Sequence, residues 1–342
     1  MKVHEHIFDR IALPENLFAA WEEFRKGKGS REDVQIFERN LETHIFALHR
    51  DLAAQTYRHG PYGAFTIQDP KQRRIHKAAV RDRILHHAVF AALNPVFEPA
   101  FIAHSFSCRK GKGTHRGVDA LERMLRQESR NRTRPCFVLK CDVHRFFASV
   151  DHAILLTILG KRIKDDRVMT LLGELVGRFG DGKGIPIGNL TSQLFANVYM
   201  NELDQCMKHE LHLKRYIRYT DDVVVLSNDR DSLQNLLPSI RSFLRGHLRL
   251  ELHPRKVTIR KHRQGVDFLG YVLLPHHRVL RTKTKRRMVR KLQERVRVLG
   301  DAEDRADTIE HSLQSYLGVF SHANAYRISQ ELRNQCWFWM NE

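Results

Sequence analysis

Apolar residues along this chain follow two spacings, and each spacing predicts a kind of element. Helical spacing is found over 1–60 with a break at 26–30, over 80–93, through Val118, Leu121 and Leu125, over 152–179, 190–211 and 231–246, and from Thr282 onward. Extended runs are found at 64–68, 136–141, 216–217, 223–226, 257–260 and 266–273. Pro95 and Pro99 are expected to end the helix that starts near Val80. This order of elements predicts an α+β fold with an antiparallel sheet.

The balance of charge indicates what the protein binds. The 342 residues include 58 Lys and Arg against 39 Asp and Glu, a formal net charge of +19. This excess predicts a polyanionic partner. As that partner, nucleic acid is favoured over a membrane surface, because no apolar stretch approaches the length of a membrane-spanning helix. The first ten residues lack the apolar core of a secretory signal, and five widely spaced cysteines favour reduced thiols, so we expect a cytoplasmic protein.

Three carboxylates stand at the ends of extended runs. The tetrapeptide Tyr-Thr-Asp-Asp at 219–222 separates the runs 216–217 and 223–226, which predicts a hairpin with two acids at its tip. Asp142 directly follows the run 136–141. Three such acids can hold two divalent ions roughly 3.5–4 Å apart, as metal-assisted phosphoryl transfer requires. The alternative is structural, since aspartate also favours turns and helix N-termini, but a turn formed for stability alone would rarely place two like charges together.

These acids and their neighbours resemble the motifs of reverse transcriptases. Residues 140–147 look like motif A of that family, and 219–222 look like its Y-x-D-D motif C. The further matches, in the order that the family shows, are 73–75 with 81–85, 104–114, Lys256 and 268–271. The resemblance extends from about residue 60 to about residue 330. Its combined order and spacing are more specific than any single motif.

The resemblance implies a right-hand polymerase with fingers, an antiparallel-sheet palm and a helical thumb. The implied boundaries are a helical N-terminal extension over 1–60, fingers over 61–135, a palm over 136–275 with a fingers portion at about 150–185, and a thumb over 276–342.

The resemblance also implies roles for individual residues. Asp142, Asp221 and Asp222 would bind two Mg²⁺ ions, for which Mn²⁺ can substitute, and the Val143 carbonyl would be a further ligand. Lys256 would protonate the leaving pyrophosphate, or be one more cation of a basic run. The remaining implied residues are Lys71, Arg73, Arg109, Lys110, Phe147, Ile187, Gly188 and Gln193 for nucleotide binding, Phe268, Leu269, Gly270 and Tyr271 for the primer grip, and Lys283, Lys285, Arg286, Arg287 and Arg290 for the template–primer duplex.

Some of these residues have an ordinary structural alternative. Phe147 matches the steric gate that excludes a ribose 2′-OH, but it is also suited to be a core aromatic beside Phe146. Each basic residue taken alone is more often a solvated side chain.

The segment 184–193, with sequence GIPIGNLTSQ, narrows the branch of the family. Ile187 stands where most reverse transcriptases have glutamine, and this form is similar to reverse transcriptases of diversity-generating retroelements, which copy template adenine with errors. The resemblance therefore implies error-prone cDNA synthesis from an RNA template, a DNA or RNA primer and dNTPs, with a small basic oligomeric accessory protein as partner.

Other functions stay open at this point. One is a defence-associated, antiphage reverse transcriptase with its own noncoding RNA. Another is a maturase-like protein that binds RNA without polymerising. An RNA ligase or two-metal nuclease is disfavoured, because the chain lacks a nucleophilic lysine motif or a fourth acid.

Overall fold

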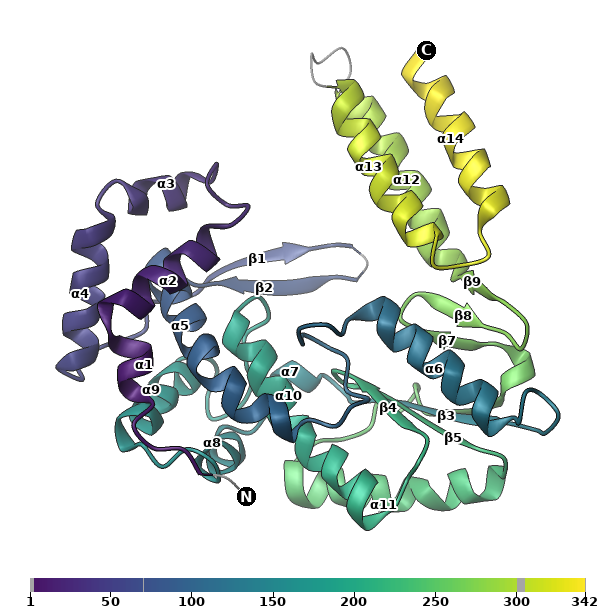
Figure 1. The fold of residues 1–342 in the computed structure, drawn as a ribbon, viewed down its shortest axis with the longest axis horizontal. Coiled ribbons are helices and arrows are strands. Elements are labelled where there is room, and N and C mark those ends of the chain that lie inside the picture. The colour runs from purple at the N-terminus through teal and green to yellow at the C-terminus, as the bar shows by residue number, and fades with distance from the viewer. Residues whose placement is uncertain (1–2, 70, 300–304, 342) are drawn as a thin grey trace. The chain divides into compact units, whose positions relative to one another are not determined.

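The protein has a mixed helix and sheet fold, which confirms the expected α+β class (Figure 1). The computed structural model describes residues 3–69, 71–299 and 305–341. The chain divides into two compact units. Unit 1 comprises residues 1–108, 141–223 and 236–257, and unit 2 comprises 109–140, 224–235 and 258–342.

Unit 1 is built mainly from helices. Their bounds are α1 Phe8–Ala12, α2 Pro14–Arg25, α3 Glu32–Glu38, α4 Leu41–Ala53, α5 Val80–Phe97, α7 Phe146–Ser149, α8 His152–Gly160, α9 Asp166–Gly177 and α10 Leu190–Gln205. Helix α5 packs against both α2 and α10, so it forms the centre of the unit's core. The predicted helices over 1–60 and their break at 26–30 are confirmed.

The prediction that Pro95 ends its helix is wrong. Helix α5 continues through Pro95 to Phe97, and Val96 and Phe97 are buried. A proline inside a helix removes one backbone hydrogen bond and crowds the preceding turn. Here the burial of the two apolar residues that follow it outweighs that cost over the last turn.

Three sheets carry the strands. The two-stranded sheet pairs β1, Gly63–Ile67, with β2, Arg73–Lys77, in antiparallel register. The four-stranded sheet has the order β4-β5-β3-β6, with β3 Phe137–Asp142, β4 Tyr216–Tyr219, β5 Asp222–Ser227 and β6 Thr258–Lys261. The strand β2 was predicted only as a basic segment, because its exposed faces lack an apolar alternation.

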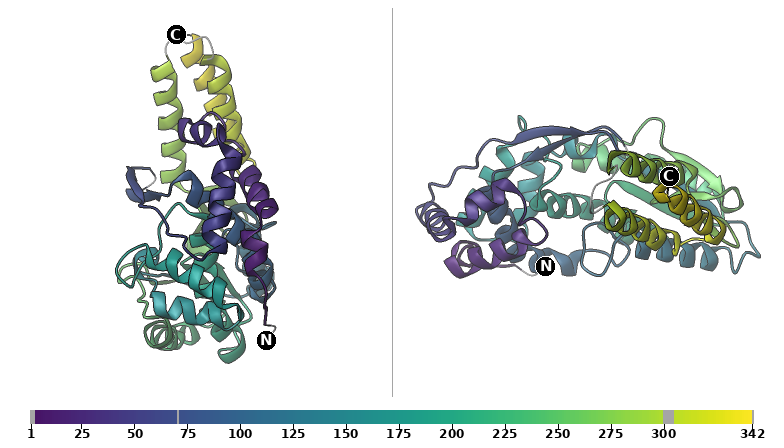
Figure 2. Two further views of the ribbon diagram at one scale, coloured as in Figure 1. Left: turned by 90° about the vertical axis from the view of Figure 1, so that its left-hand side faces the viewer. Right: turned by 90° about the horizontal axis from the view of Figure 1, so that it is seen from above.

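Unit 2 contains the third sheet and a group of helices. The sheet has the order β7-β8-β9, with β7 Val266–Phe268, β8 Tyr271–Leu273 and β9 Arg278–Leu280. The single strand predicted over 266–273 is therefore two strands, which are joined by a tight turn where Leu269 and Gly270 have φ of 50° and 92°. Helices α12 Thr282–Leu299, α13 Arg305–Phe320 and α14 Tyr326–Asn341 pack together in the unit, as the two views of Figure 2 show. Helix α6, Thr114–Glu128, also belongs to unit 2.

Helix α11, Arg230–Leu248, starts in the residues of unit 2 and ends in those of unit 1. Over the described ranges of the chain, we find no helix with the length and apolar character needed to span a bilayer.

Candidate active site

The acid pair lies on the short connection between β4 and β5 in unit 1. Thr220 has a left-handed backbone with φ of 53°, and Asp222 is already the first residue of β5. A β-branched residue in the left-handed region is strained, so neighbouring contacts must hold it there. The predicted hairpin with acids at its tip is confirmed as a structure.

Those contacts come from a buried arginine of β4. Arg218 is fully buried and donates to both carboxylate oxygens of Asp204, at 2.8 and 2.6 Å. Its Nη1 also donates to the Thr220 carbonyl at 2.9 Å. On the other side of the turn, the Thr220 hydroxyl donates to the Ser107 hydroxyl at 2.6 Å. Arg218 of β4 and two more distant residues, Asp204 and Ser107, therefore fix the turn that carries Asp221 and Asp222.

Asp142 is placed beside this turn by backbone hydrogen bonds. It ends β3, and the amide of the next residue, Val143, donates to the Asp221 carbonyl at 3.3 Å. The amide of His253 donates to the Asp142 carbonyl at 2.7 Å. The structure thus brings together the acids that sequence reasoning paired across about eighty residues.

Lys256 also reaches this site. Its Nζ lies 2.8 Å from Oδ1 of Asp142, and 41% of the lysine side chain stays exposed. The sequence left open whether Lys256 was a site residue or one more cation of a basic run. The distance places it at the acids.

The acids repel one another at short range. Burial, together with the charges of Asp142 and Asp222, raises the pKa of Asp221 to about 6. Lys256 acts in the opposite direction. A cation at these carboxylates would relieve the repulsion, and carboxylate and carbonyl oxygens are the ligands that Mg²⁺ prefers. The donor atoms therefore suit a divalent metal. As placed in the described residues, however, no three or more His, Cys, Asp or Glu side chains lie close enough together to hold one.

The predicted nucleotide-binding residues divide between the two units. In unit 1 the amide of His76 in β2 donates to the Ile187 carbonyl at 3.0 Å, so the β1–β2 hairpin is tied to the segment 187–193. Gly188 has φ of +123°, and an added Cβ would lie 3.0 Å from the Ile75 side chain.

Lys71, Arg73 and Gln193 are exposed, whereas Phe147 is half-buried and contacts Phe146 at 5.3 Å between ring centroids. Arg109 and Lys110 belong to unit 2.

The predicted primer-grip residues form the β7–β8 hairpin of unit 2. Phe268 pairs with Tyr271 across the hairpin, and the Tyr271 hydroxyl donates to the Val319 carbonyl at 3.1 Å. The predicted duplex-binding cations, Lys283 to Arg290, all lie on α12. Three of them, Lys285, Arg286 and Arg290, line a cavity of about 310 Å³ between α12 and α14.

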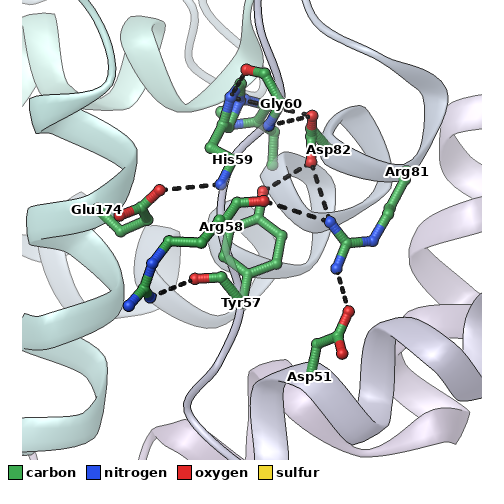
Figure 3. Close-up of polar contacts among 9 residues, drawn as sticks. Asp51, Tyr57, Arg58, His59, Gly60, Arg81, Asp82 and Glu174 are labelled. Carbon is green, nitrogen blue, oxygen red and sulfur yellow. Dashed lines mark hydrogen bonds and ion pairs between the residues drawn. The ribbon is translucent and has the colours of Figure 1, made fainter.

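A buried polar network around α5 was not foreseen. The Tyr57 hydroxyl donates to Asp82 at 2.8 Å, and the Gly60 amide donates to the same carboxylate at 3.1 Å (Figure 3). The network continues through His59 to His86 at 3.2 Å and from His86 to Thr191 at 2.8 Å. Burial lowers the pKa of His86 to about 3, so this imidazole is neutral. The network connects α5 to the first turn of α10.

The residues that sequence reasoning missed are Arg218, Asp204 and Ser107. The signal for Arg218 was a lone charge between the apolar Ile217 and the aromatic Tyr219. Its partner could not be found by spacing, because Asp204 lies on a different element.

Comparison with known families agrees with this geometry. The model of the family described as reverse transcriptase (RNA-dependent DNA polymerase) matches residues 67–273, which include all three acids and Lys256. The chain therefore belongs to the reverse transcriptase family.

Three similar relatives are curated proteins. Protein YkfC of Escherichia coli K12 is 27% identical over 256 residues, covering 63% of this chain and 65% of the relative. The group II intron-encoded protein LtrA of Lactococcus lactis is 21% identical over 271 residues, covering 59% and 44%. Nuclear intron maturase 4 of Arabidopsis thaliana is 24% identical over 220 residues, covering 58% and 26%. The chain spans less than two thirds of the length of each relative.

Proposed function

We propose that this protein is an RNA-directed DNA polymerase that makes cDNA by metal-assisted attack of a primer 3′-OH on a dNTP. The observation that supports it most is the meeting of Asp142, Asp221 and Lys256 at one place in unit 1. The family membership supports the same reaction. The proposal includes the right-hand division into fingers, palm and thumb at the boundaries expected from the sequence.

The roles of the residues follow from their chemistry. Asp142, Asp221 and Asp222, with the Val143 carbonyl, would hold two Mg²⁺ ions, which when bound supply charge neutralisation at the reacting phosphate. Lys256 keeps its ammonium beside Asp142 and can give a proton from Nζ to the departing pyrophosphate. Arg218 positions the acid-bearing turn through the Thr220 carbonyl.

Side chains around the acids would select the substrate. Phe147 would exclude the 2′-OH of a ribonucleotide by the bulk of its ring. Lys71, Arg73, Arg109 and Lys110 would offset the charge of the triphosphate. The primer grip of the β7–β8 hairpin and the cations of α12 would hold the template–primer duplex by its backbone.

The test is primer extension with an RNA template, a DNA primer, dNTPs and Mg²⁺. We expect extension by the wild type and none by the Asp221→Ala, Asp222→Ala double variant. Extension by the double variant would mean that these acids are not the catalytic centre. A gel shift without extension by either protein would support the non-polymerising alternative.

The choice of biological role rests on Ile187. We propose the error-prone, diversity-generating branch, since an apolar side chain in place of glutamine loses hydrogen bonds that favour the correct pair. The wild type should misincorporate opposite template adenine more often than the Ile187→Gln variant. Equal error rates at adenine would contradict this branch.

A second candidate role comes from the relatives. Two of them are named as an intron-encoded protein and an intron maturase, which supports an RNA partner of intron type. A defence-associated enzyme with its own noncoding RNA would share the same chemistry. Sequencing the RNA that purifies with the protein separates these roles, since each predicts a different RNA.

A further inference from the structure

A cationic cavity lies within unit 1, next to the start of α10. Its volume is about 270 Å³. The end of α2, the β1–β2 hairpin, α5 and the first turn of α10 all contribute to its wall. Four cations line it, namely Lys28, Arg31, Lys77 and Arg83.

The positive charge of this cavity exceeds its local compensation. Asp33 pairs with Lys77 at 2.7 Å and with Arg83. Within the described part of the chain, Lys28 and Arg31 form no ion pair. Burial lowers the pKa of Lys28, and the charges of Arg31 and Arg83 lower it further. An anion placed among these cations would relieve their mutual repulsion.

The helix end that faces this cavity lacks its usual cap. Asn189 precedes α10, a helix of 16 residues, and its side chain makes no capping hydrogen bond. Only 3% of Asn189 is exposed, and among the residues that the structure describes neither its amide nitrogen nor its amide oxygen has a hydrogen-bond partner. A buried amide without partners is costly, so it points to a ligand that supplies them. The N-terminus of a helix itself favours a phosphate.

We propose that this cavity binds one phosphate-bearing nucleotide. The phosphate would lie among the cations at the start of α10, and the Asn189 amide can donate to it or to a base. Phe65 lines the same cavity and is 50% exposed, so its ring is available to a base. The volume is near the lower limit of about 300 Å³ for small-ligand pockets. That the ligand is a nucleotide rests on the proposed function, whereas the binding of an anion is inferred from the residues of the cavity alone.

The nucleotide has two sources that share this chemistry. It is either one unit of a single-stranded RNA or a free nucleotide. Two predicted nucleotide-binding residues, Gly188 and Gln193, line this cavity, whereas Lys71 and Arg73 do not. Because of this division, we assign the cavity to a nucleotide other than the dNTP whose triphosphate Lys71 and Arg73 would contact.

Binding to nucleic-acid-free protein tests the proposal. The probes are AMP and a ten-nucleotide single-stranded RNA, measured in EDTA without dNTPs, so that polymerisation is not required. We expect Asn189→Leu and Arg31→Gln each to weaken binding of a probe at least fivefold. Arg39→Gln is the matched control, because Arg39 is an exposed cation of the same N-terminal region that does not line the cavity. Its effect should stay below twofold.

Thermal unfolding gives a second readout. Leucine has the same branched arrangement of four side-chain heavy atoms as asparagine and no polar atoms, so Asn189→Leu should raise the melting temperature of the ligand-free protein while it weakens binding. AMP binding that both variants weaken would identify a free nucleotide, and an effect on RNA alone would identify a strand. Arg31 is exposed, so its replacement should not disturb the fold. If Arg31→Gln bound both probes as tightly as the wild type does, the proposal would be overturned. That result would leave the primer-extension test of the proposed function unaffected.

Discussion

Arg218 and Asp204 form a fully buried ion pair in which two guanidinium nitrogens meet the two carboxylate oxygens, at 2.8 and 2.6 Å. The pair also contacts the Tyr216 hydroxyl, which donates to Asp204 at 2.6 Å. Because the same guanidinium donates to the Thr220 carbonyl, the pair links the core of unit 1 to the turn that carries Asp221.

We predict that Arg218→Lys lowers both stability and activity. Lysine keeps the charge but cannot make the two-pronged contact together with the bond to Thr220. Breaking a buried pair costs about 3 kcal/mol or more, and misplacement of the turn should slow primer extension roughly 100-fold. Denaturant unfolding and single-turnover extension measure the two effects. The control Arg167→Lys alters an exposed pair with Asp9 and should change neither.

Lys256 offers a test of proton donation. Lys256→Met should slow primer extension roughly 100-fold. Lys256→Arg restores the charge beside Asp142, but arginine does not release its proton, so the rate should stay low. Full recovery by Lys256→Arg would show a purely electrostatic role. The neighbouring exposed cation is the control, and Arg255→Met should extend primers at the wild-type rate.

Gly188 should not tolerate a side chain. Its φ of +123° disfavours other residues, and a Cβ would approach the His76 carbonyl at 3.3 Å as well as Ile75. Gly188→Ala should therefore cost about 1–3 kcal/mol of unfolding free energy. Gly173→Ala, in α9 where an added Cβ meets nothing within 4 Å, should instead stabilise the protein by about 0.5–1 kcal/mol. Urea unfolding of the two variants compares them directly, and an equal change in unfolding free energy in both would contradict this prediction.

The half-buried Phe147 tests sugar discrimination. Phe147→Ala should increase ribonucleotide incorporation relative to dNTPs roughly 10- to 100-fold, because the proposed role of this ring is to exclude the 2′-OH. The ratio of the two incorporation efficiencies is the measurement. Phe46→Ala, which truncates an exposed ring in α4, should leave the ratio unchanged. An unchanged ratio in Phe147→Ala would indicate a core role only.

Buried histidines should make the protein less stable in mild acid. Burial and the nearby Lys28 charge lower the pKa of His87 to about 4, and burial lowers that of His86 to about 3, against 6.5 for an ordinary histidine. Below pH 6.5 the unfolded chain takes up protons that the folded protein does not. Stability should therefore fall as the pH drops from 6.5 toward 4, by about 1 kcal/mol per histidine between pH 7.5 and 5.5.

The variant His87→Phe checks the sign of this effect. It should lose less stability than the wild type between pH 7.5 and 5.5, as measured by denaturant unfolding at each pH. The exposed residue His209 supplies the control, and His209→Phe should keep the wild-type dependence. A steeper loss in His87→Phe would contradict the prediction.

Local patterns were sufficient to find the acids. Asp142, Asp221 and Asp222 each adjoin a short, largely buried apolar run, so both the strands and their polar ends were visible in the sequence. The hairpin β7–β8 could also have been found, since Gly270 marks the turn that splits the predicted strand.

Long-range packing was not visible. The spacing of residues does not predict the contact between Arg218 and Asp204. The expectation that a proline ends a helix does not take into account the burial of Val96 and Phe97 after Pro95. The strand β2 escaped prediction because its side chains are mostly exposed and charged. Such features depend on partners far along the chain, which no local window contains.

The turn at Thr220 has a consequence for how the candidate site forms. Its conformation depends on Ser107, on Arg218 with its partner Asp204, and on the amide of Val143, which lie on different segments of the chain. A nascent or partly folded chain therefore has the acids but lacks their arrangement.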